Sequence, residues 1–201
     1  MAESCGLIVP LGNWVIDAAI RQVADWMQSA RTMPVAINLS AYQLNQTDLL
    51  QRISSALERH QVPADLIMLE ITESVVMQNA ESSLELMNRL TEIGIRFSID
   101  DFGTGYSSLS YLRRFVTSQL KIDRSFILDM EHSEDARAIV GAIVQLAHAL
   151  GMRVVAEGVE NRAQYRYLQT LGCDEIQGFL FSRPVPANEI SAMNTTLAGD
   201  V

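Results

Sequence analysis

The stretch Phe97–Leu109 reads FSIDDFGTGYSSL and combines the features that decide the fold. Its apolar start predicts a buried strand over Arg96–Ile99. Asp100 and Asp101 follow directly, and two adjacent carboxylates at the end of a buried strand are costly unless a cation compensates them. Side chains alternate along a strand, so both carboxylates can face the same opening only where the strand turns into a loop. The stretch therefore predicts a strand that ends in a charged site.

The same unit, a short apolar run followed by a polar residue and a helical pattern, recurs along the chain. Strands are predicted over Val35–Leu39, Ile67–Ile71, Arg96–Ile99, Gln119–Ile122, Arg153–Ala156 and Glu175–Leu180. Helices are predicted over Leu11–Ser29, Gln43–His60, Glu81–Ile93, Tyr106–Phe115, Ser133–Leu150, Arg162–Leu171 and Ala187–Met193. This alternation is typical of an α/β fold with a mainly parallel sheet.

Two α/β architectures compete, an open doubly wound sheet and a closed (β/α)8 barrel. Polar residues end nearly every predicted strand, and such a ring of functional groups favours the barrel. These residues are Asn38, Glu70, Asp100, Asp101, Lys121, Glu157 and Gln177. Only six strands are found and the chain opens on a helix, so we expect an incomplete TIM-type barrel whose first strands are missing. Residues 1–193 would form this single domain, and residues 194–201 a flexible tail.

Composition narrows the class of protein. The chain has 201 residues, 48% of them hydrophobic, which is enough for one substantial core. Its formal net charge of −9 argues against a long nucleic acid, but a small phosphate ligand held through metal ions remains open. Two cysteines fit a reducing cytosol. No run approaches the roughly 20 apolar residues of a membrane span. We therefore expect a cytoplasmic chain that makes no membrane contact itself.

The acids at the strand ends predict a metal site. Glu70, Asp100, Asp101 and Glu157 offer oxygen ligands without a histidine, which suits hard cations such as Mg²⁺ or Mn²⁺. Asn38 could add a neutral oxygen. Two such ions could activate a water for in-line attack on phosphorus. Any one of these acids could equally cap a helix or lie in a solvated loop, but that explanation is poor for the whole set.

Lys121 ends an apolar strand and leaves several roles open. It could orient a water or a phosphate, form a Schiff base with a carbonyl substrate, or pair with a neighbouring acid. Asp123, in the same stretch, is either a helix cap or a salt-bridge partner. The triplet DFG also occurs in protein kinases, but the other kinase motifs are absent from the sequence. The glycine-rich segment after the two aspartates is better explained as a loop able to close over a site.

Six motifs in order carry a family resemblance. They are INLS (37–40), LEITES (69–74), IDDFGTGYSSLSYL (99–112), LKIDRSFI (120–127), VVAEGVE (154–160) and DEIQGFLFSRP (174–184). Together they resemble the EAL-domain phosphodiesterases of bacterial cyclic di-GMP signalling, over nearly the whole chain. The resemblance implies a (β/α)8 barrel that hydrolyses cyclic di-GMP to linear pGpG with two Mg²⁺ or Mn²⁺ ions.

The resemblance also implies a role for each matching residue. The implied metal ligands are Asn38, Glu70, Asp100, Asp101 and Glu157. The implied catalytic residues are Lys121, beside the attacking water, and Glu157, at that water or at a metal. Support of the substrate or of the closing loop is implied for Glu73, Glu160, Gln177, Gly103, Thr104 and Gly105. The closing loop often joins a dimer contact in this family, so a homodimer is expected.

Two departures from the family pattern bear on activity. The Glu-Ala-Leu segment that names the family, whose glutamate is a metal ligand, does not occur in the sequence. The family usually reads Phe-Pro-x-Asp before LKID, where this chain has Phe115-Val116-Thr117-Ser118. We therefore expect an N-terminally truncated family member with impaired hydrolysis. The alternative is an inactive module that binds cyclic di-GMP or a protein, and the chain could be the cytoplasmic portion of a larger, membrane-attached sensor.

Overall fold

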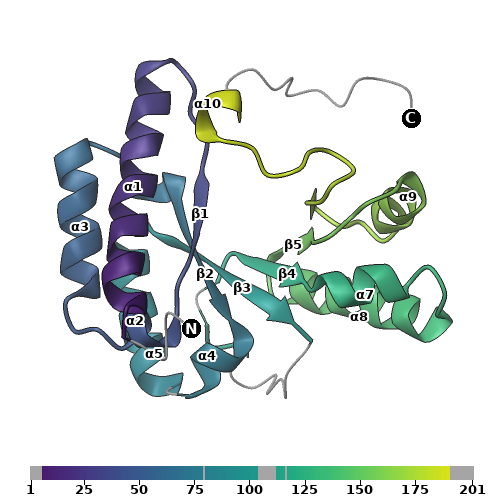
Figure 1. Ribbon diagram of the computed structural model, residues 1–201. Coiled ribbons are helices and arrows are strands. Elements are labelled where there is room, and N and C mark those ends of the chain that lie inside the picture. Colours follow the sequence, from purple (N-terminus) through teal and green to yellow (C-terminus); the bar gives the residue numbers. More distant parts are fainter. Residues whose placement is uncertain (1–5, 79, 104–111, 116, 191–201) are drawn as a thin grey trace.

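A single parallel sheet organises the molecule (Figure 1). The computed structural model describes residues 6–78, 80–103, 112–115 and 117–190. Its strands are β1 (Val35–Asn38), β2 (Ile67–Thr72), β3 (Arg96–Phe102), β4 (Gln119–Ile122), β5 (Arg153–Ala156) and β6 (Glu175–Ile176). Each strand pairs in parallel with the next one along the chain. A doubly wound sheet would reverse its order at a switch point. The unreversed order confirms the prediction of an incomplete TIM-type barrel.

Helices follow most of the strands. They are α1 (Ile8–Gln28), α2 (Ala41–Leu44), α3 (Leu49–His60), α4 (Glu73–Gln78), α5 (Ala80–Glu92), α7 (Arg124–Asp129), α8 (Glu134–Ala149), α9 (Arg162–Thr170) and α10 (Ala187–Ile190), with a 3-10 turn at Ala64–Leu66. Of these, α1, α4, α5 and α8 pack directly against the strands. α1 packs against α3 beside β1, while α7 packs against α8 farther along the sheet (Figure 1). Among the described residues, no helix combines the length and apolar character needed to cross a membrane.

The core lies between the sheet and these helices, and it explains where the polar groups go. Ile71, Ile99 and Leu120 are each no more than 1% exposed and belong to the hydrophobic core. Because side chains alternate across a strand, Glu70, Asp100 and Lys121 point to the opposite face. Parallel pairing then brings the carboxyl ends of neighbouring strands, with their polar residues, to the same edge of the sheet.

Two predicted elements differ from the observed ones, and two observed helices were not predicted. The prediction of a strand up to Leu180 is wrong beyond Ile176, because Gly178 lies against the backbone of Val159 and the chain turns there. A Cβ at Gly178 would come within 2.1 Å of the Val159 carbonyl oxygen. The predicted helix Gln43–His60 is two helices, α2 and α3, and the short helices α4 and α7 were not predicted. The predicted helix Tyr106–Phe115 lies mostly outside the described residues, as does the tail 194–201.

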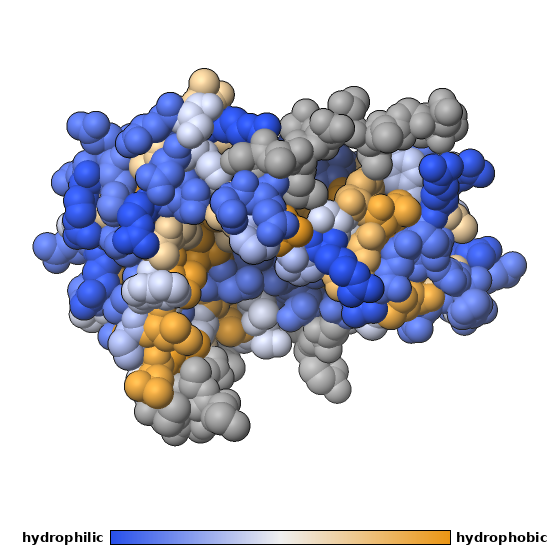
Figure 2. Space-filling model, turned by 45° about the horizontal axis from the view of Figure 1, so that its top comes forward, coloured by the Kyte–Doolittle hydropathy of each residue, from blue (hydrophilic) through white to orange (hydrophobic). Residues whose placement is uncertain are grey.

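The surface is mainly hydrophilic, with a few hydrophobic patches (Figure 2). Exposed large apolar side chains include Leu7, Leu11 and Trp14 at the start of α1, and Phe179 and Phe181 after β6. Within the described residues, β1 pairs only with β2 and β6 only with β5. The sheet is therefore open, and its two outer edges are at β1 and β6.

Candidate metal centre

Lys121, the only lysine of the chain, is the centre of a buried ion cluster. Its Nζ lies 3.0 Å from Glu70 Oε1, 3.1 Å from Asp100 Oδ1 and 2.6 Å from Glu157 Oε1. The Lys121 side chain is only 5% exposed. The four residues come from β2, β3, β4 and the residue after β5. The sheet thus gathers side chains that are far apart in the sequence around one ammonium group.

The charges in this cluster hold Lys121 protonated. Burial by itself would lower the pKa of Lys121, but the hydrogen bond to Glu157 and the charge of Glu70 outweigh burial and raise it above its ordinary value. Burial raises the pKa of Glu157, and the neighbouring charges of Asp100 and Glu70 add to that rise against the opposing effect of Lys121. An ammonium with a raised pKa is unsuited to Schiff-base chemistry, which needs a neutral amine.

A backbone irregularity directs both aspartates to the same place. The pairing of β3 with β4 shifts its register between Ile99 and Phe102, as at a β-bulge. Asp101 has a φ of 53°, in the left-handed region that a residue with a Cβ rarely adopts, and its N–H donates to Asp100 Oδ1 at 3.0 Å. The bulge removes the alternation of a regular strand, so neighbouring side chains reach the same opening.

The acidic side chains are arranged as metal ligands would be. One carboxylate oxygen each from Asp100, Asp101 and Glu157 lie within 4.8 Å of one another. Burial and the adjacent Asp100 charge raise the pKa of Asp101. With Glu70, four carboxylates gather here, and three of them contact the single ammonium of Lys121, which leaves negative charge uncompensated. Hard divalent cations prefer carboxylate oxygens, so these donors fit the metal ions expected from the sequence.

The remaining predicted site residues lie around this cluster at different depths. Asn38 is exposed at the end of β1, level with Glu70 in the paired strand. Glu73 is buried in the first turn of α4, and its carboxylate oxygens have no hydrogen-bond partner within the described ranges. Gly103 follows β3 directly, whereas Thr104 and Gly105 lie outside the described residues.

Glu160 and Gln177 lie beside Glu157 at a small hollow of about 170 Å³. The hollow also involves two residues that the sequence reasoning did not single out, Arg124 and Phe179. Arg124 comes three residues after Lys121, just beyond a strand end, and that position was the only signal that could have found it. Asp123 is a helix cap, since its Oδ1 accepts a hydrogen bond from the Ser125 N–H at 2.9 Å.

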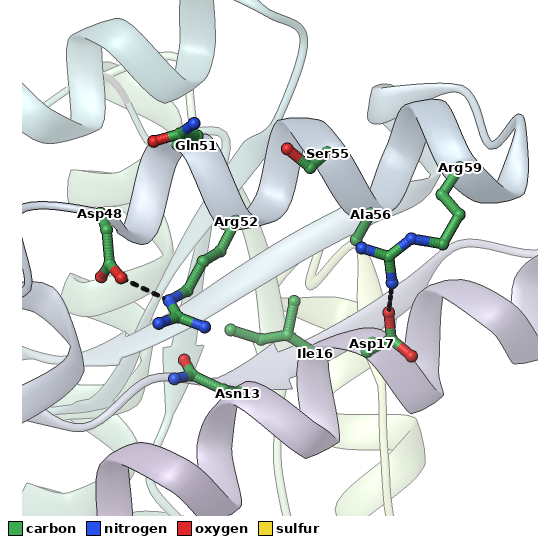
Figure 3. Close-up of a pocket in the computed structure, with 9 residues that line it drawn as sticks. All are labelled: Asn13, Ile16, Asp17, Asp48, Gln51, Arg52, Ser55, Ala56 and Arg59. Atoms are coloured by element: carbon green, nitrogen blue, oxygen red, sulfur yellow. Dashed lines mark hydrogen bonds and ion pairs between the residues drawn. The ribbon is translucent and has the colours of Figure 1, made fainter.

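A second hollow, of about 370 Å³, lies on the helical side of the sheet between α1 and α3 (Figure 3). Arg52 and Arg59 line it, but each is already paired with an aspartate. Arg52 Nε lies 2.7 Å from Asp48 Oδ2, and Arg59 Nη1 lies 2.8 Å from Asp17 Oδ1. The pair of Arg59 with Asp17 joins α3 to α1, whereas the pair of Arg52 with Asp48 lies at the start of α3 itself. We assign this hollow no functional role.

The comparisons agree with the geometry. The model of the EAL domain matches residues 1–184, more than nine tenths of the chain. The chain belongs to the EAL domain family. It is 47% identical over 193 residues to the bifunctional diguanylate cyclase/cyclic di-GMP phosphodiesterase MucR of Pseudomonas aeruginosa, covering 96% of this chain and 28% of MucR. The chain therefore spans less than a third of the length of that relative.

Solved structures of EAL proteins show the same fold with ligands bound. The PaMucR phosphodiesterase in complex with c-di-GMP superposes with a TM-score of 0.91 at 47% identity, over 94% of this chain and 77% of that chain. Klebsiella pneumoniae BlrP1 in a calcium and cyclic di-GMP complex gives a TM-score of 0.78 at 32% identity, over 86% of this chain and 44% of BlrP1. This EAL domain is thus a homologue of proteins whose solved structures hold c-di-GMP, together with calcium in BlrP1.

Proposed function

We propose that this chain is a metal-dependent phosphodiesterase that hydrolyses cyclic di-GMP to linear pGpG. The observation that carries the proposal is the cluster of Glu70, Asp100, Asp101 and Glu157 around Lys121 at the carboxyl ends of the strands. Active sites of TIM-type barrels lie at this end. A cyclic dinucleotide carries two negatively charged phosphates, which an acidic cluster repels. Such a cluster can therefore bind this substrate only if cations lie between the carboxylates and the phosphates.

The acids would hold two divalent cations, Mg²⁺ or Mn²⁺. Asp100, Asp101 and Glu157 are the closest set of oxygen donors, while Glu70 and Asn38 extend it toward β1. Bound there, the cations would supply Lewis-acid stabilisation of the phosphate and activation of a water. The raised pKa values of Asp101 and Glu157 fit acids that lack a sufficient counter-charge of their own.

Lys121 would then orient the attacking water, and Glu157 would accept its proton. The ammonium of Lys121 is held rigidly by three carboxylates and can donate a hydrogen bond to the attacking water or to a phosphate oxygen. Glu157 has a raised pKa, which makes its carboxylate a better proton acceptor than an ordinary glutamate. Glu160 and Gln177 would support the substrate beside it, and Glu73 would support the loop that follows Gly103.

A second candidate function is binding without turnover. It is favoured by one observation, that the sequence contains no Glu-Ala-Leu triplet and so no glutamate from that motif. A metal site that is short of one carboxylate binds its cations more weakly and stabilises less charge in the transition state. Such a chain would still present Lys121, Arg124 and the remaining acids to cyclic di-GMP.

One experiment separates the two functions. The chain is incubated with cyclic di-GMP and Mn²⁺, and pGpG is separated by chromatography; binding is measured in parallel by calorimetry with Ca²⁺. Metal-dependent pGpG formation that Asp100→Asn abolishes is expected. Glu92→Gln, which changes an exposed acid at the end of α5, is the matched control and should leave turnover intact. Binding without product would favour the module, and product formation that survives Asp100→Asn would contradict the proposed site.

A further inference from the structure

The loop that carries Glu157 is short and is held from two sides. It runs from Glu157, directly after β5, to Asn161, directly before α9. The Glu157 N–H donates to the Ile122 carbonyl oxygen at 3.2 Å, and the Val159 N–H donates to the Gln177 carbonyl oxygen at 3.1 Å. Backbone groups of β4 and of the segment after β6 therefore fix the first half of the loop, up to Val159.

A buried side chain, that of Gln164, holds the second half of the loop. Its Oε1 accepts hydrogen bonds from the Glu160 N–H at 2.7 Å and from the Asn161 N–H at 3.2 Å. Gln164 lies in the first turn of α9 and is 2% exposed. Both contacts depend on one oxygen atom, so a single substitution at this position removes them together.

The same side chain connects the loop to the helix that follows Lys121. Gln164 Nε2 lies 3.5 Å from the Ile127 carbonyl oxygen of α7, at the long end for a hydrogen bond. α7 comes directly after β4 and Asp123, and Lys121 belongs to β4. In return, Asn161 Oδ1 accepts from the Gln164 N–H at 3.0 Å, which completes a capping box at the start of α9. Gln164 thus stands between the two segments that supply Glu157 and Lys121.

An exposed ion pair also reaches this half of the loop, but it is the weaker support. Arg124 Nη2 lies 2.5 Å from Glu160 Oε1, and the two side chains are 53% and 37% exposed. Water screens such a pair, so it contributes little to holding the loop in place. The Gln164 side chain is shielded from water, and its hydrogen bonds are correspondingly costly to lose.

Packing alone does not explain a glutamine at this position. Gln164 and Leu168, one turn apart, form the buried face of α9, where an apolar side chain would fill the same space. A buried amide is favourable only when its polar atoms are paired. The hydrogen bonds to the loop are therefore the better reason for this residue, and the loop they hold begins at Glu157.

We propose that Gln164 is a positioning residue of the candidate active site. It holds Glu160 and Asn161 by their N–H groups, and through this loop it fixes the Glu157 carboxylate against the Lys121 ammonium, 2.6 Å away. The inference rests on the proposed function, since it takes Glu157 as a metal ligand and proton acceptor. It goes further by assigning the placement of that carboxylate to a side chain of α9 that is not itself a ligand.

The test measures Mn²⁺ affinity by calorimetry without nucleotide, and then the turnover of cyclic di-GMP. Gln164→Met keeps the length of the side chain but removes the amide oxygen. It should weaken Mn²⁺ binding and lower kcat, each by about tenfold to a hundredfold, because small displacements of a ligating or reacting group have effects of this size. KM should change little, since the residue lies behind the loop rather than at the substrate. Gln164→Glu retains an oxygen that accepts from both N–H groups, so it should recover most of both losses.

Two variants of the same helix separate positioning from stability. Gln169→Met makes the same substitution at an exposed position of α9 and should match wild type in every measurement. Leu168→Ala removes buried apolar contacts of α9 without touching the loop. It should lower the melting temperature, measured in a chelator, at least as much as Gln164→Met does. Below the melting transition of each variant, its Mn²⁺ affinity and kcat should stay near those of wild type.

The outcomes distinguish this inference from the proposed function. Unchanged Mn²⁺ affinity and kcat in Gln164→Met overturn the positioning role and leave the proposed function standing. Equal losses in Leu168→Ala, or losses that Gln164→Glu does not reduce, also overturn the positioning role. A wild-type chain that binds Mn²⁺ but forms no pGpG overturns the proposed function alone, because the Mn²⁺ affinities of the variants still test Gln164. A wild-type chain that binds no Mn²⁺ overturns both.

Discussion

Charged side chains gather at both ends of β4 and β5, and the two groups differ in burial. At the carboxyl end, Lys121 is 5% exposed and contacts three acids. At the amino end, Arg153 Nη1 lies 3.0 Å from Glu175 Oε1, but these side chains are 62% and 44% exposed. Similar distances thus carry different energies, because water screens the second pair and has been largely removed from the first.

The difference shows what each end is for. At the amino end, the buried Gln119 also donates from Nε2 to Glu175 at 3.2 Å, and His148 pairs with Asp174 at 2.8 Å. These contacts join β6 and its preceding loop to the rest of the sheet. The buried group, by contrast, holds more negative than positive charge, which stability alone does not favour. Excess buried charge is more easily explained by ligand binding than by folding.

Among the variants that test this difference in burial, Lys121→Met should cause the largest loss of unfolding free energy. Removing the ammonium takes away the partner of two buried carboxylates, Glu70 and Asp100, and of the partly buried Glu157. Such a loss typically costs about 3–5 kcal/mol. Urea unfolding in the presence of a chelator measures the change. Arg153→Ala is the matched variant at the exposed end, and it should cost at most about 1 kcal/mol. Equal losses in the two variants would contradict the assignment of burial as the deciding factor.

The single lysine offers an independent check of its burial. Amine-reactive reagents should modify the native chain at its N-terminus only, and should reach Lys121 when urea unfolds the protein. Mass spectrometry after brief labelling distinguishes the two sites. Rapid modification of Lys121 in the native chain would show that the cluster is open to solvent.

A smaller effect is expected from glycines at the two ends of β5. Gly158 and Gly151 both have positive φ, +70° and +76°, so alanine strains either backbone by about 1–2 kcal/mol. At Gly158 the new Cβ would also meet Arg124, whereas at Gly151 nothing lies within 4 Å. Gly158→Ala should therefore lower the melting temperature more than Gly151→Ala. A larger decrease for Gly151→Ala would contradict this prediction and would mean that the Arg124 side chain moves aside without loss of stability.

Cation affinity should depend on pH through the buried acids. Asp101 and Glu157 have raised pKa values, and only their deprotonated forms ligate a cation. Mn²⁺ binding should therefore weaken as the pH falls. The weakening should begin at a higher pH than it would at a site made of carboxylates with ordinary pKa values. Titrations of Mn²⁺ between pH 7 and pH 5 measure this, with Asp174→Asn as a control at the opposite end. An affinity that is constant over this range would contradict the prediction.

The smallest effect is expected from Asp174 at the amino end. Burial would raise the pKa of Asp174, but the hydrogen bonds from His148 and from the Val154 N–H outweigh it and lower the pKa below 3.8. Because the pKa of Asp174 is lower in the folded state than in the unfolded state, its carboxylate stabilises the fold above pH 3.8. This stabilisation is lost as the pH falls through the folded-state pKa. Asp174→Asn should thus cost at most about 1 kcal/mol at pH 7, and the variant should converge with wild type in acid.

Much of the fold could be predicted because it depends on local periodicity. Six apolar runs, each ending in a polar residue, correspond to the six strands, and their alternation with helices indicated a parallel sheet. The predicted last strand was too long because Phe179 and Leu180 add apolar residues after Ile176. The chain turns at Gly178 because Val159 packs against it, and Val159 lies 19 residues earlier in the sequence.

The sequence by itself determined the strands, the barrel type, the family and the set of acids at the strand ends, because each depends on residue types over short spans. Only the tertiary structure decided which acids meet Lys121, that Asp101 turns at a bulge, and that Arg124 pairs with Glu160 across 36 residues. These features depend on strand register and on distances between separate elements. Long-range packing fixes such distances, and no local pattern records them.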